Sequence, residues 1–517
     1  MWTDSALLLS TGSAEFAVSS FRFRIEKNRK EIKEKMSEST VSEEQKNGIP
    51  VPEEGTPEFA KMNKMARVAI PVVLIIFTLG VLQQQAFGMI YVNIGKQLNQ
   101  TNLAPLITSL PGIILGIVCV IYGSLGDFVS LKKMMILGTI VFVLGSILGC
   151  FGTFSIWIVI AARVVQSAGW QVSGSIFLVL VSKYVEKKKR VLWYGVFVAV
   201  FRFAAALGVF LAGYMTLLDW RWLFGVGIVA VFFIPVLAKN LPDQHAAGAK
   251  IDGIGFTLIG LFAASVTMFF TDINWGWGIA CIVTLVAFLV YVNNASNPFI
   301  TPKMLTNPAF AMTMTVIFVG YFFSYTLNAG VNAIGLNVYG IDSSKVSNLL
   351  VWSIILAGIM GFAAGPIIQK IGRKASVILA LACMGGGLIA IAFLIPAGKI
   401  WALAVAPCIY YFGTSFFYQP IVDTATLTVE PEESGRALGF NDLLQAITGS
   451  IGVALFGQLM ANGSMGSGSL AGTKQGLAST YANVFMIGGV IILLGLVLFI
   501  CSMKMIYSHS RVAEDED

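Results

Sequence analysis

The fold class that the sequence predicts is an all-α polytopic membrane protein. Of its 517 residues, 56% are hydrophobic and only 12% are charged, about half the charged share of a typical soluble domain. Apolar stretches long enough to cross a ~30 Å hydrocarbon core recur from Val68 onward. The net charge of +7 comes from basic residues in short loops between these stretches, which indicates topology determinants and not nucleic-acid binding.

The first 67 residues differ from the rest, because they are polar and rich in Ser, Glu and Lys. Such a segment cannot bury enough apolar surface to offset the entropy of ordering, so we expect residues 1–67 to be disordered and cytoplasmic. No apolar signal-peptide core occurs within it. The Lys33–Lys35 run before Met36 resembles a translated ribosome-binding site, so we expect residues 1–35 to be a gene-model extension.

Fourteen apolar runs, bounded by polar residues or by Gly and Pro, follow this segment. We interpret them as membrane-spanning helices, of which the eighth is short and has Trp275 and Trp277 at its start. In order, the predicted helices are Val68–Tyr91, Ala104–Gly123, Met134–Phe151, Phe154–Val181, Val191–Met215, Trp222–Leu237, Gly253–Phe270, Gly276–Tyr291, Ala309–Leu327, Leu349–Pro366, Ala375–Leu394, Trp401–Thr426, Ala437–Met460 and Tyr481–Met503.

An even number of spans places both termini on one side of the membrane. If that side is the cytoplasm, the inside loops hold fourteen Lys and Arg residues and the outside loops five, as the positive-inside rule requires. We therefore expect a protein of the inner (plasma) membrane with a short cytoplasmic tail. The expected parts are a six-helix bundle, a linker with two extra helices, a second six-helix bundle and the tail, at residues 68–239, 240–295, 296–507 and 508–517.

A Gly-rich, basic turn occurs twice at corresponding places in the two expected bundles, which indicates an internal repeat of the kind common in transporters. The first copy closes the second span and the second copy closes the tenth. Such turns can form contacts in one state of a carrier and release them in the other, although a generic basic loop is the alternative. The candidate latch residues are Gly123, Asp127, Lys132, Lys133, Gly365, Gly372, Arg373 and Lys374.

The repeated turn resembles the signature loop of the major facilitator superfamily. Arg163–Gly169 resembles a motif of the fourth helix in the fourteen-helix drug:proton antiporter branch, and Glu432–Asn441 resembles its thirteenth-helix pattern. Gly208 and Gly213 on the fifth span are similar to the glycines of the branch's helix-packing motif. The resemblance implies that Arg163 and Gln166 lie in a substrate or proton pathway. It departs at the first helix, where Gln84 replaces the acid that the branch usually carries.

Ionisable groups at membrane depth are costly and therefore mark candidate functional sites. Arg163 and Arg202 lie well inside their spans, with structural packing as the alternative role. Asp423 and Asp442 flank one loop at equal depth, so we expect them to face one cavity and to carry protons, unless the cytoplasm hydrates them. In the glutamine run of the first span, Gln84 and Gln85 are candidates for hydrogen bonding to substrate or to other helices. Aromatic residues between Tyr321 and Tyr418 are numerous enough to line an amphipathic pocket.

The inventory argues against an enzyme, because there are only two histidines and no cysteine spacing that suits a metal or redox centre. No P-loop is present. We expect a secondary active transporter without a cofactor, acting as a monomer and exporting amphipathic small molecules by proton-coupled alternating access. The alternatives are an organic-anion carrier or exchanger, suggested by the two arginines, and a receptor or scaffold with a transporter fold.

Overall fold

The computed structural model describes residues 54–125, 129–243, 252–296, 298–395, 398, 400–430, 433–463, 465–468 and 476–508. Within these residues the regular secondary structure is entirely helical, which confirms the predicted all-α class. The first group of helices comprises α2 (Pro57–Gln97), α3 (Leu106–Leu125), α4 (Leu131–Gly149), η1 (Gly152–Phe154), α5 (Ile156–Tyr184), α6 (Lys187–Met215), α7 (Trp222–Ile228), η2 (Val229–Phe233) and α8 (Ile234–Asn240).

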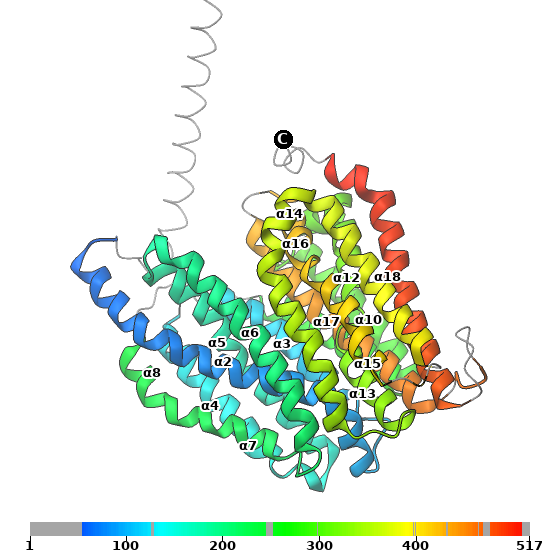
Figure 1. Cartoon of the computed structure of the whole chain (residues 1–517). Helices are drawn as coiled ribbons and strands as arrows, with labels where there is room; N and C mark the ends of the chain where they lie inside the picture. Colours follow the sequence, from blue (N-terminus) through cyan, green and yellow to red (C-terminus); the bar gives the residue numbers. More distant parts are fainter. Residues whose placement is uncertain are drawn as a thin grey trace, which may run out of the picture.

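The remaining helices form a second group beside the first (Figure 1). Two of them, α9 and α10, pair with each other, and α9 packs on α3 and α17. The members are α9 (Gly253–Thr271), α10 (Trp275–Asn294), α11 (Pro302–Thr306), α12 (Pro308–Tyr321), α13 (Thr326–Asn337), α14 (Ser343–Leu394), α15 (Ala402–Ser415), α16 (Tyr418–Leu427), α17 (Ser434–Asn462) and α18 (Leu477–Tyr507).

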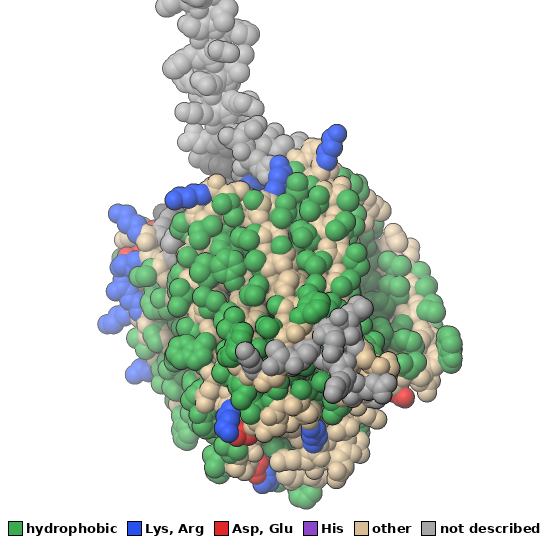
Figure 2. Space-filling model, turned by 45° about the vertical axis from the view of Figure 1, so that its right-hand side comes forward, with side chains coloured by type: hydrophobic (Ala, Val, Ile, Leu, Met, Phe, Trp, Pro, Cys, Tyr) green, Lys and Arg blue, Asp and Glu red, His purple; other side chains and the backbone are tan. Residues whose placement is uncertain are grey.

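The outer surface has the apolar character of a multi-pass membrane protein. Eleven helical stretches in the described residues are long and apolar enough to span a bilayer. Large apolar side chains such as Leu137 and Phe232 are exposed on the outside, and Figure 2 shows hydrophobic side chains covering the face between charged residues at its upper and lower edges. An exposed apolar surface of this extent is stable in lipid and not in water.

The first helix begins earlier than expected. It starts at Pro57, so residues 57–67 are helical, and the prediction of disorder is wrong for them. Thr56 accepts a hydrogen bond from the Phe59 amide, and Pro57 occupies the first turn, where its missing amide hydrogen costs nothing. Asn63 then donates a hydrogen bond of 2.7 Å to the carbonyl of Tyr184, which ties this polar turn to the end of α5.

Three predicted spans are broken and two are joined. The sixth is divided into α7, η2 and α8. The ninth becomes α12 and α13, with a turn at residues 322–325 between them, and the twelfth becomes α15 and α16. The turn fits because Gly452 of α17 lies against it, where any Cβ would collide with the carbonyl of Phe322. The tenth and eleventh spans run together as α14 and meet at Gly372, whose φ of 80° and ψ of 163° interrupt the helix.

Two pairs of helices carry much of the contact between the groups, α3 with α17 and α6 with α14. A Cβ at Gly116 would lie 2.6 Å from that of Ala446, so α3 and α17 are closely packed. At the predicted helix-packing glycines, a Cβ at Gly208 would collide with Leu82 of α2, and one at Gly213 would collide with Ser347 of α14.

Contact between α6 and α14 extends over only part of their length. A Cβ at Gly358 would still lie 3.2 Å from Cβ of Arg202, whereas one at Gly361, at Gly365 or at Gly195 would meet nothing within 4 Å. This part of α14 leads to Lys374, which lies against Tyr507 near the C-terminus, and Figure 1 shows the two groups separating toward that end. The groups are therefore closely packed at the opposite end.

Candidate functional site

Arg163 is the most deeply buried charge in the described part of the chain, with 1% of its surface exposed. Its Nη2 donates to Oε1 of Gln84 at 2.7 Å, and its Nη1 donates to Oε1 of Gln166 at 2.8 Å. The guanidinium also lies over the ring of Phe87, 4.6 Å from its centroid. The structure therefore brings together three of the residues that the sequence analysis selected.

Two further residues complete this network, and the sequence analysis did not select them. Gln166 donates through Nε2 to Oγ of Ser146 at 2.8 Å and to Oε1 of Gln83 at 3.2 Å. Gln83 in turn donates to the carbonyl of Leu223 at 2.5 Å. Gln85 is half-buried and takes no part in the hydrogen bonds recorded for the described residues. The glutamine run was the available signal, but it did not reveal which face of the helix is turned inward.

A second arginine lies at the contact between the two groups. Arg202 on α6 is half-buried, packs its Cβ toward Gly358 of α14 and has its guanidinium 5.8 Å from the ring centroid of Phe201. No carboxylate among the described residues forms an ion pair with Arg163 or with Arg202.

Asp442 on α17 lies in an aromatic and polar environment. Its Oδ1 accepts hydrogen bonds from the Tyr418 hydroxyl at 3.2 Å and from Nδ2 of Asn441 at 2.9 Å. Beside Tyr418, the ring of Phe417 lies 5.3 Å from that of Tyr321, between centroids.

Asp423 is placed differently from Asp442, although both were expected to face one cavity. Its carboxylate is 55% exposed and lies 3.3 Å from Nε of Arg373, and no recorded hydrogen bond or ion pair joins the two acids within the described residues. α16 ends at Leu427, only four residues beyond Asp423, so this side chain lies near the helix end and is accessible to water.

Three of the four basic residues in the predicted latch turns contact their own helix group. Lys132 lies 3.9 Å from Asp243, which also accepts a hydrogen bond from Ser130. In the second turn, Arg373 pairs with Asp423, and Nζ of Lys374 lies 4.7 Å above the ring of Tyr507. Lys133 is exposed, Gly123 lies in α3, and Gly365 has open space around it. The predicted residue Asp127 lies outside the described residues.

Hydrogen bonds join the two groups at the end opposite the C-terminus. Asn332 of α13 donates through Nδ2 to Oδ1 of Asn93 at 3.0 Å, and Asn93 donates to Oγ of Ser343 at 3.1 Å. Lys96 donates to Oδ1 of Asn337 at 2.6 Å. We call Asn93, Lys96, Asn332, Asn337 and Ser343 the closed-end cluster. Its uncharged amides and hydroxyl can separate and rehydrate more cheaply than buried ion pairs.

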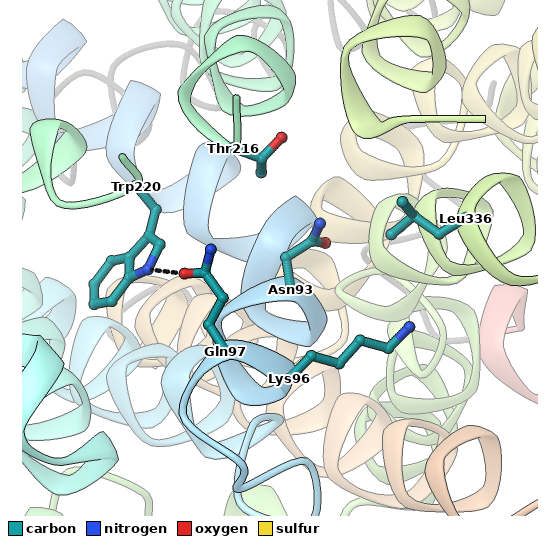
Figure 3. Close-up of a pocket in the computed structure, with 6 residues that line it drawn as sticks. All are labelled: Asn93, Lys96, Gln97, Thr216, Trp220 and Leu336. Carbon is teal, nitrogen blue, oxygen red and sulfur yellow. Dashed lines mark hydrogen bonds between the residues drawn. The ribbon is translucent and has the colours of Figure 1, made fainter. Parts of the chain in front are cut away.

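A cavity of about 220 Å³ adjoins the closed-end cluster (Figure 3). Trp220 and Gln97 form one wall of the cavity. Nε1 of Trp220 donates a hydrogen bond to Oε1 of Gln97 at 2.6 Å. The other lining residues come from both groups, which places the cavity at the seam between them. They are Asn93, Lys96, Thr216 and Leu336.

The sequence profile of the Major Facilitator Superfamily matches this chain over residues 73–453 and again over residues 309–513. The chain belongs to the major facilitator superfamily. The two overlapping matches together cover all the apolar helices of both groups, from within α2 to the end of α18. The resemblance noted in the repeated turns is thereby confirmed, and the protein is a multi-pass membrane transporter rather than an enzyme.

Relatives with assigned names point to the drug-transporter branch. The chain is 22% identical over 363 residues to multidrug transporter protein MdtP of Bacillus subtilis (strain 168), a match that covers 66% of this chain and 65% of that protein. It is 23% identical over 413 residues to quinolone resistance protein NorB of Staphylococcus aureus (strain MSSA476), covering 76% of this chain and 88% of that protein.

Solved structures support the fold. A bacterial homologue of the human drug peptide transporters PepT1 and PepT2 superposes with a TM-score of 0.60 at 14% identity, covering 86% of this chain and 100% of that one. An auto-inhibited POT family peptide transporter also gives a TM-score of 0.60 at 14% identity, covering 84% and 96%. At this identity, the likeness concerns the fold of the transporter and not its substrate.

Proposed function

We propose that this protein is a secondary active transporter that exports amphipathic small molecules in exchange for protons by alternating access. Two observations support alternating access. The helix groups are joined by the closed-end cluster at one end, and α6 and α14 lose contact beyond Gly358 toward the other. An interface that is closed at one end only is what a carrier needs in each of its two main states.

We further propose fourteen spans, arranged as two six-helix bundles with α9 and α10 inserted between them. The eleven long apolar stretches support this count when α14 is counted as two spans, because Gly372 interrupts it. The shorter apolar α3 and the broken pair of α15 and α16 supply the others. With the termini in the cytoplasm, as the loop charges predict, the closed-end cluster faces the exterior and the site is open to the cytoplasm.

The uncharged surroundings of Asp442 are the observation that supports proton coupling. Gln84, which replaces the usual first-helix acid, binds Arg163 and cannot titrate. Asp423 is exposed and bound to Arg373, whereas Asp442 lies two turns inside α17 with only uncharged hydrogen-bond donors recorded around it. A carboxylate in such surroundings can bind and release a proton without breaking an ion pair.

The test is Asp442→Asn, with Asp423→Asn as the matched control. In everted vesicles with an imposed pH gradient, Asp442→Asn should abolish proton-driven accumulation of an amphipathic substrate. Substrate exchange without a gradient should continue, because exchange needs no proton. Asp423→Asn should keep the proton-driven component. Normal gradient-driven accumulation by Asp442→Asn would refute the proposed role of this acid.

A second candidate function is an organic-anion carrier. It is favoured by Arg163 and Arg202, which have no carboxylate partner within the described residues. Under this alternative Arg202→Gln should be the damaging change, and Asp442→Asn should be mild. Transport of an anion panel by the two variants distinguishes the functions.

A further inference from the structure

The cavity of about 220 Å³ beside the closed-end cluster can hold a small ligand between the two helix groups. A protein cavity of ~150 Å³ is large enough to hold benzene, so this one has room for a ring with one polar substituent. The first group contributes five of its six lining residues, and α13 of the second group contributes Leu336. Lys96 and Gln97 are exposed at its edge, so a ligand can enter from the solvent.

Hydrogen bonds within the protein already use the amide oxygens on the cavity wall. Oε1 of Gln97 accepts from Trp220, and Oδ1 of Asn93 accepts from Asn332. The indole nitrogen of Trp220 can only donate, so it fixes the orientation of the Gln97 amide, whose nitrogen points away from it toward Thr216 (Figure 3). This nitrogen has no hydrogen bond recorded among the described residues. The amide group that remains free to bind a ligand is therefore a donor.

Lys96 gives the same wall a positive charge. Its ammonium donates to Asn337 at 2.6 Å, which leaves two of its three hydrogens for other acceptors. No acid is among the six lining residues, and no ion pair of Lys96 is recorded in the described part of the chain. Donors beside an unpaired positive charge favour an anionic ligand. Leu336 and the ring of Trp220 supply apolar surface for the body of that ligand.

The side chains on this wall also hold the two helix groups together. Lys96 binds Asn337 of α13, and Asn93 binds Asn332 of the same helix. When the groups separate, Leu336 leaves the cavity wall and these side chains lose the partners that orient them. A ligand that binds one of two states more tightly shifts the equilibrium toward that state. An anion in this cavity therefore favours the closed state.

We propose that this cavity is a regulatory site for small organic anions with an apolar body, and that the bound anion holds the closed end shut. The anionic group binds Lys96 and the amide nitrogen of Gln97, and the body lies against Leu336 and Trp220. The cavity lies at the closed end, whereas the proposed transport site is open at the other end. The inference therefore goes beyond the proposed export function, and its test needs no measurement of transport.

The probes are benzenesulfonate and benzenesulfonamide, which have nearly the same shape, although only the first is charged at neutral pH. Both are titrated by calorimetry into the purified full-length protein. Benzenesulfonate should bind about tenfold more tightly, because the sulfonamide lacks the charge that strengthens the contact with Lys96. Equal affinities would overturn the inference, and this result needs no variant to fold.

Two variants assign the contacts. Gln97→Glu keeps an oxygen that can accept from Trp220 but replaces the free donor with a negative charge. It should weaken sulfonate binding about tenfold or more and leave sulfonamide binding nearly unchanged. Lys96→Gln should reduce sulfonate affinity to that of the sulfonamide. Lys345→Gln is the control, because Lys345 lies at the same end but pairs with Asp342, and it should bind the sulfonate as the parent protein does. Sulfonate binding by Gln97→Glu at the parent affinity would overturn the inference.

Closure is measured with a buried cysteine. In a background without native cysteines, Ser347→Cys lies where α14 contacts Gly213 of α6, so it should react with N-ethylmaleimide only when the groups separate. Benzenesulfonate at about ten times its dissociation constant should slow this reaction about tenfold. Ser353→Cys is the matched control. Ser353 is buried on the same helix against the carbonyl of Ala404 in its own group, so its reaction should not change.

Sulfonate binding that leaves the reaction of Ser347→Cys unchanged would overturn the inference, because the anion would then bind both states equally. A faster reaction would also overturn it, since the anion would then favour opening. Equal slowing at Ser347→Cys and Ser353→Cys would show a general stabilisation of the protein and not closure at this end, and the inference would fail.

Discussion

Arg163 carries a full charge in a place where only neutral groups are recorded as its hydrogen-bond partners. Two amide oxygens, from Gln84 and Gln166, accept its hydrogen bonds, and the face of Phe87 lies against it. Buried arginines are usually paired with an acid, because an unpaired charge is costly away from water. Gln83 and Ser146 orient the amide of Gln166, so several weak contacts together do what one carboxylate does elsewhere.

This arrangement predicts unequal effects at neighbouring glutamines. Gln84→Ala should lower the free energy of unfolding by about 1–3 kcal/mol, because a buried guanidinium hydrogen loses its acceptor. Gln85→Ala is the matched control and should change stability little, since Gln85 has no recorded hydrogen bond. Thermal unfolding of the two purified variants measures the difference. Equal losses in both would show that Gln84 is not the essential acceptor.

At the residue scale, the sequence predicted the chemistry better than the orientation. Arg163, Arg202 and Asp442 could be selected because charges at membrane depth are rare whatever the packing. Gln84 was selected and accepts a hydrogen bond from Arg163, whereas Gln83, which also bonds within the network, was not selected, because three consecutive glutamines differ only in the rotation of the helix. The pairing of Asp423 with Arg373 was also missed, since it depends on how α14 packs beside α16.

Within single elements, α14 shows how a basic turn can interrupt a long helix. Gly372 has a positive φ together with an extended ψ, a backbone region that residues with a Cβ occupy only at a cost. Gly372→Ala should therefore lower the free energy of unfolding by about 1–3 kcal/mol. Circular dichroism during thermal unfolding of the purified variant would detect it.

The same element offers a control. Gly386 lies in regular helix with open space around it, so Gly386→Ala should raise stability by about 0.5–1 kcal/mol through its better helix propensity. Its neighbours Gly385 and Gly387 are unsuitable, because a Cβ there would lie within 2.8 Å of Leu493 or Tyr410. If Gly372→Ala were as harmless as Gly386→Ala, the turn would not require glycine.

The hydropathy pattern of the sequence predicted the helical segments but not the positions at which they are interrupted. Lipid selects for apolar length, so the predicted spans coincide with helices over most of their extent. The breaks between α12 and α13 and between α15 and α16 depend instead on tertiary contacts, such as the carbonyl of Phe322 against Gly452. The helical start at Pro57 was missed for a similar reason, since Asn63 is stabilised by Tyr184, far along the chain.

For the molecule as a whole, the proposed orientation can be tested directly. In a background without native cysteines, a single cysteine at Ile273, in the exposed connection between α9 and α10, should react with an impermeant maleimide in intact cells. A cysteine at Ser508, just after α18, should react only after permeabilisation. The reverse pattern would invert the proposed topology and place the closed-end cluster in the cytoplasm.

Because the hydrogen bonds of the closed-end cluster are formed, the structure represents the state that is closed at this end. Alternating access requires the cluster to open. Asn93 and Asn332 lie on α2 and α13, one in each helix group, and their side chains are 3.0 Å apart between Nδ2 and Oδ1. If the two groups separate here once per cycle, a covalent link between these positions must stop transport. A link within one group must not, because that group moves as a unit.

We therefore expect the double substitution Asn93→Cys with Asn332→Cys, joined by a short thiol-cleavable bismaleimide, to abolish transport and to regain it after cleavage. Gln97→Cys with Trp220→Cys is the matched pair. It lies at the same end and its side chains are in contact, but both belong to the first group, so transport should continue when it is joined. Transport by the linked Asn93–Asn332 pair would mean that this end stays closed throughout the cycle. Alternating access at this interface would then be excluded.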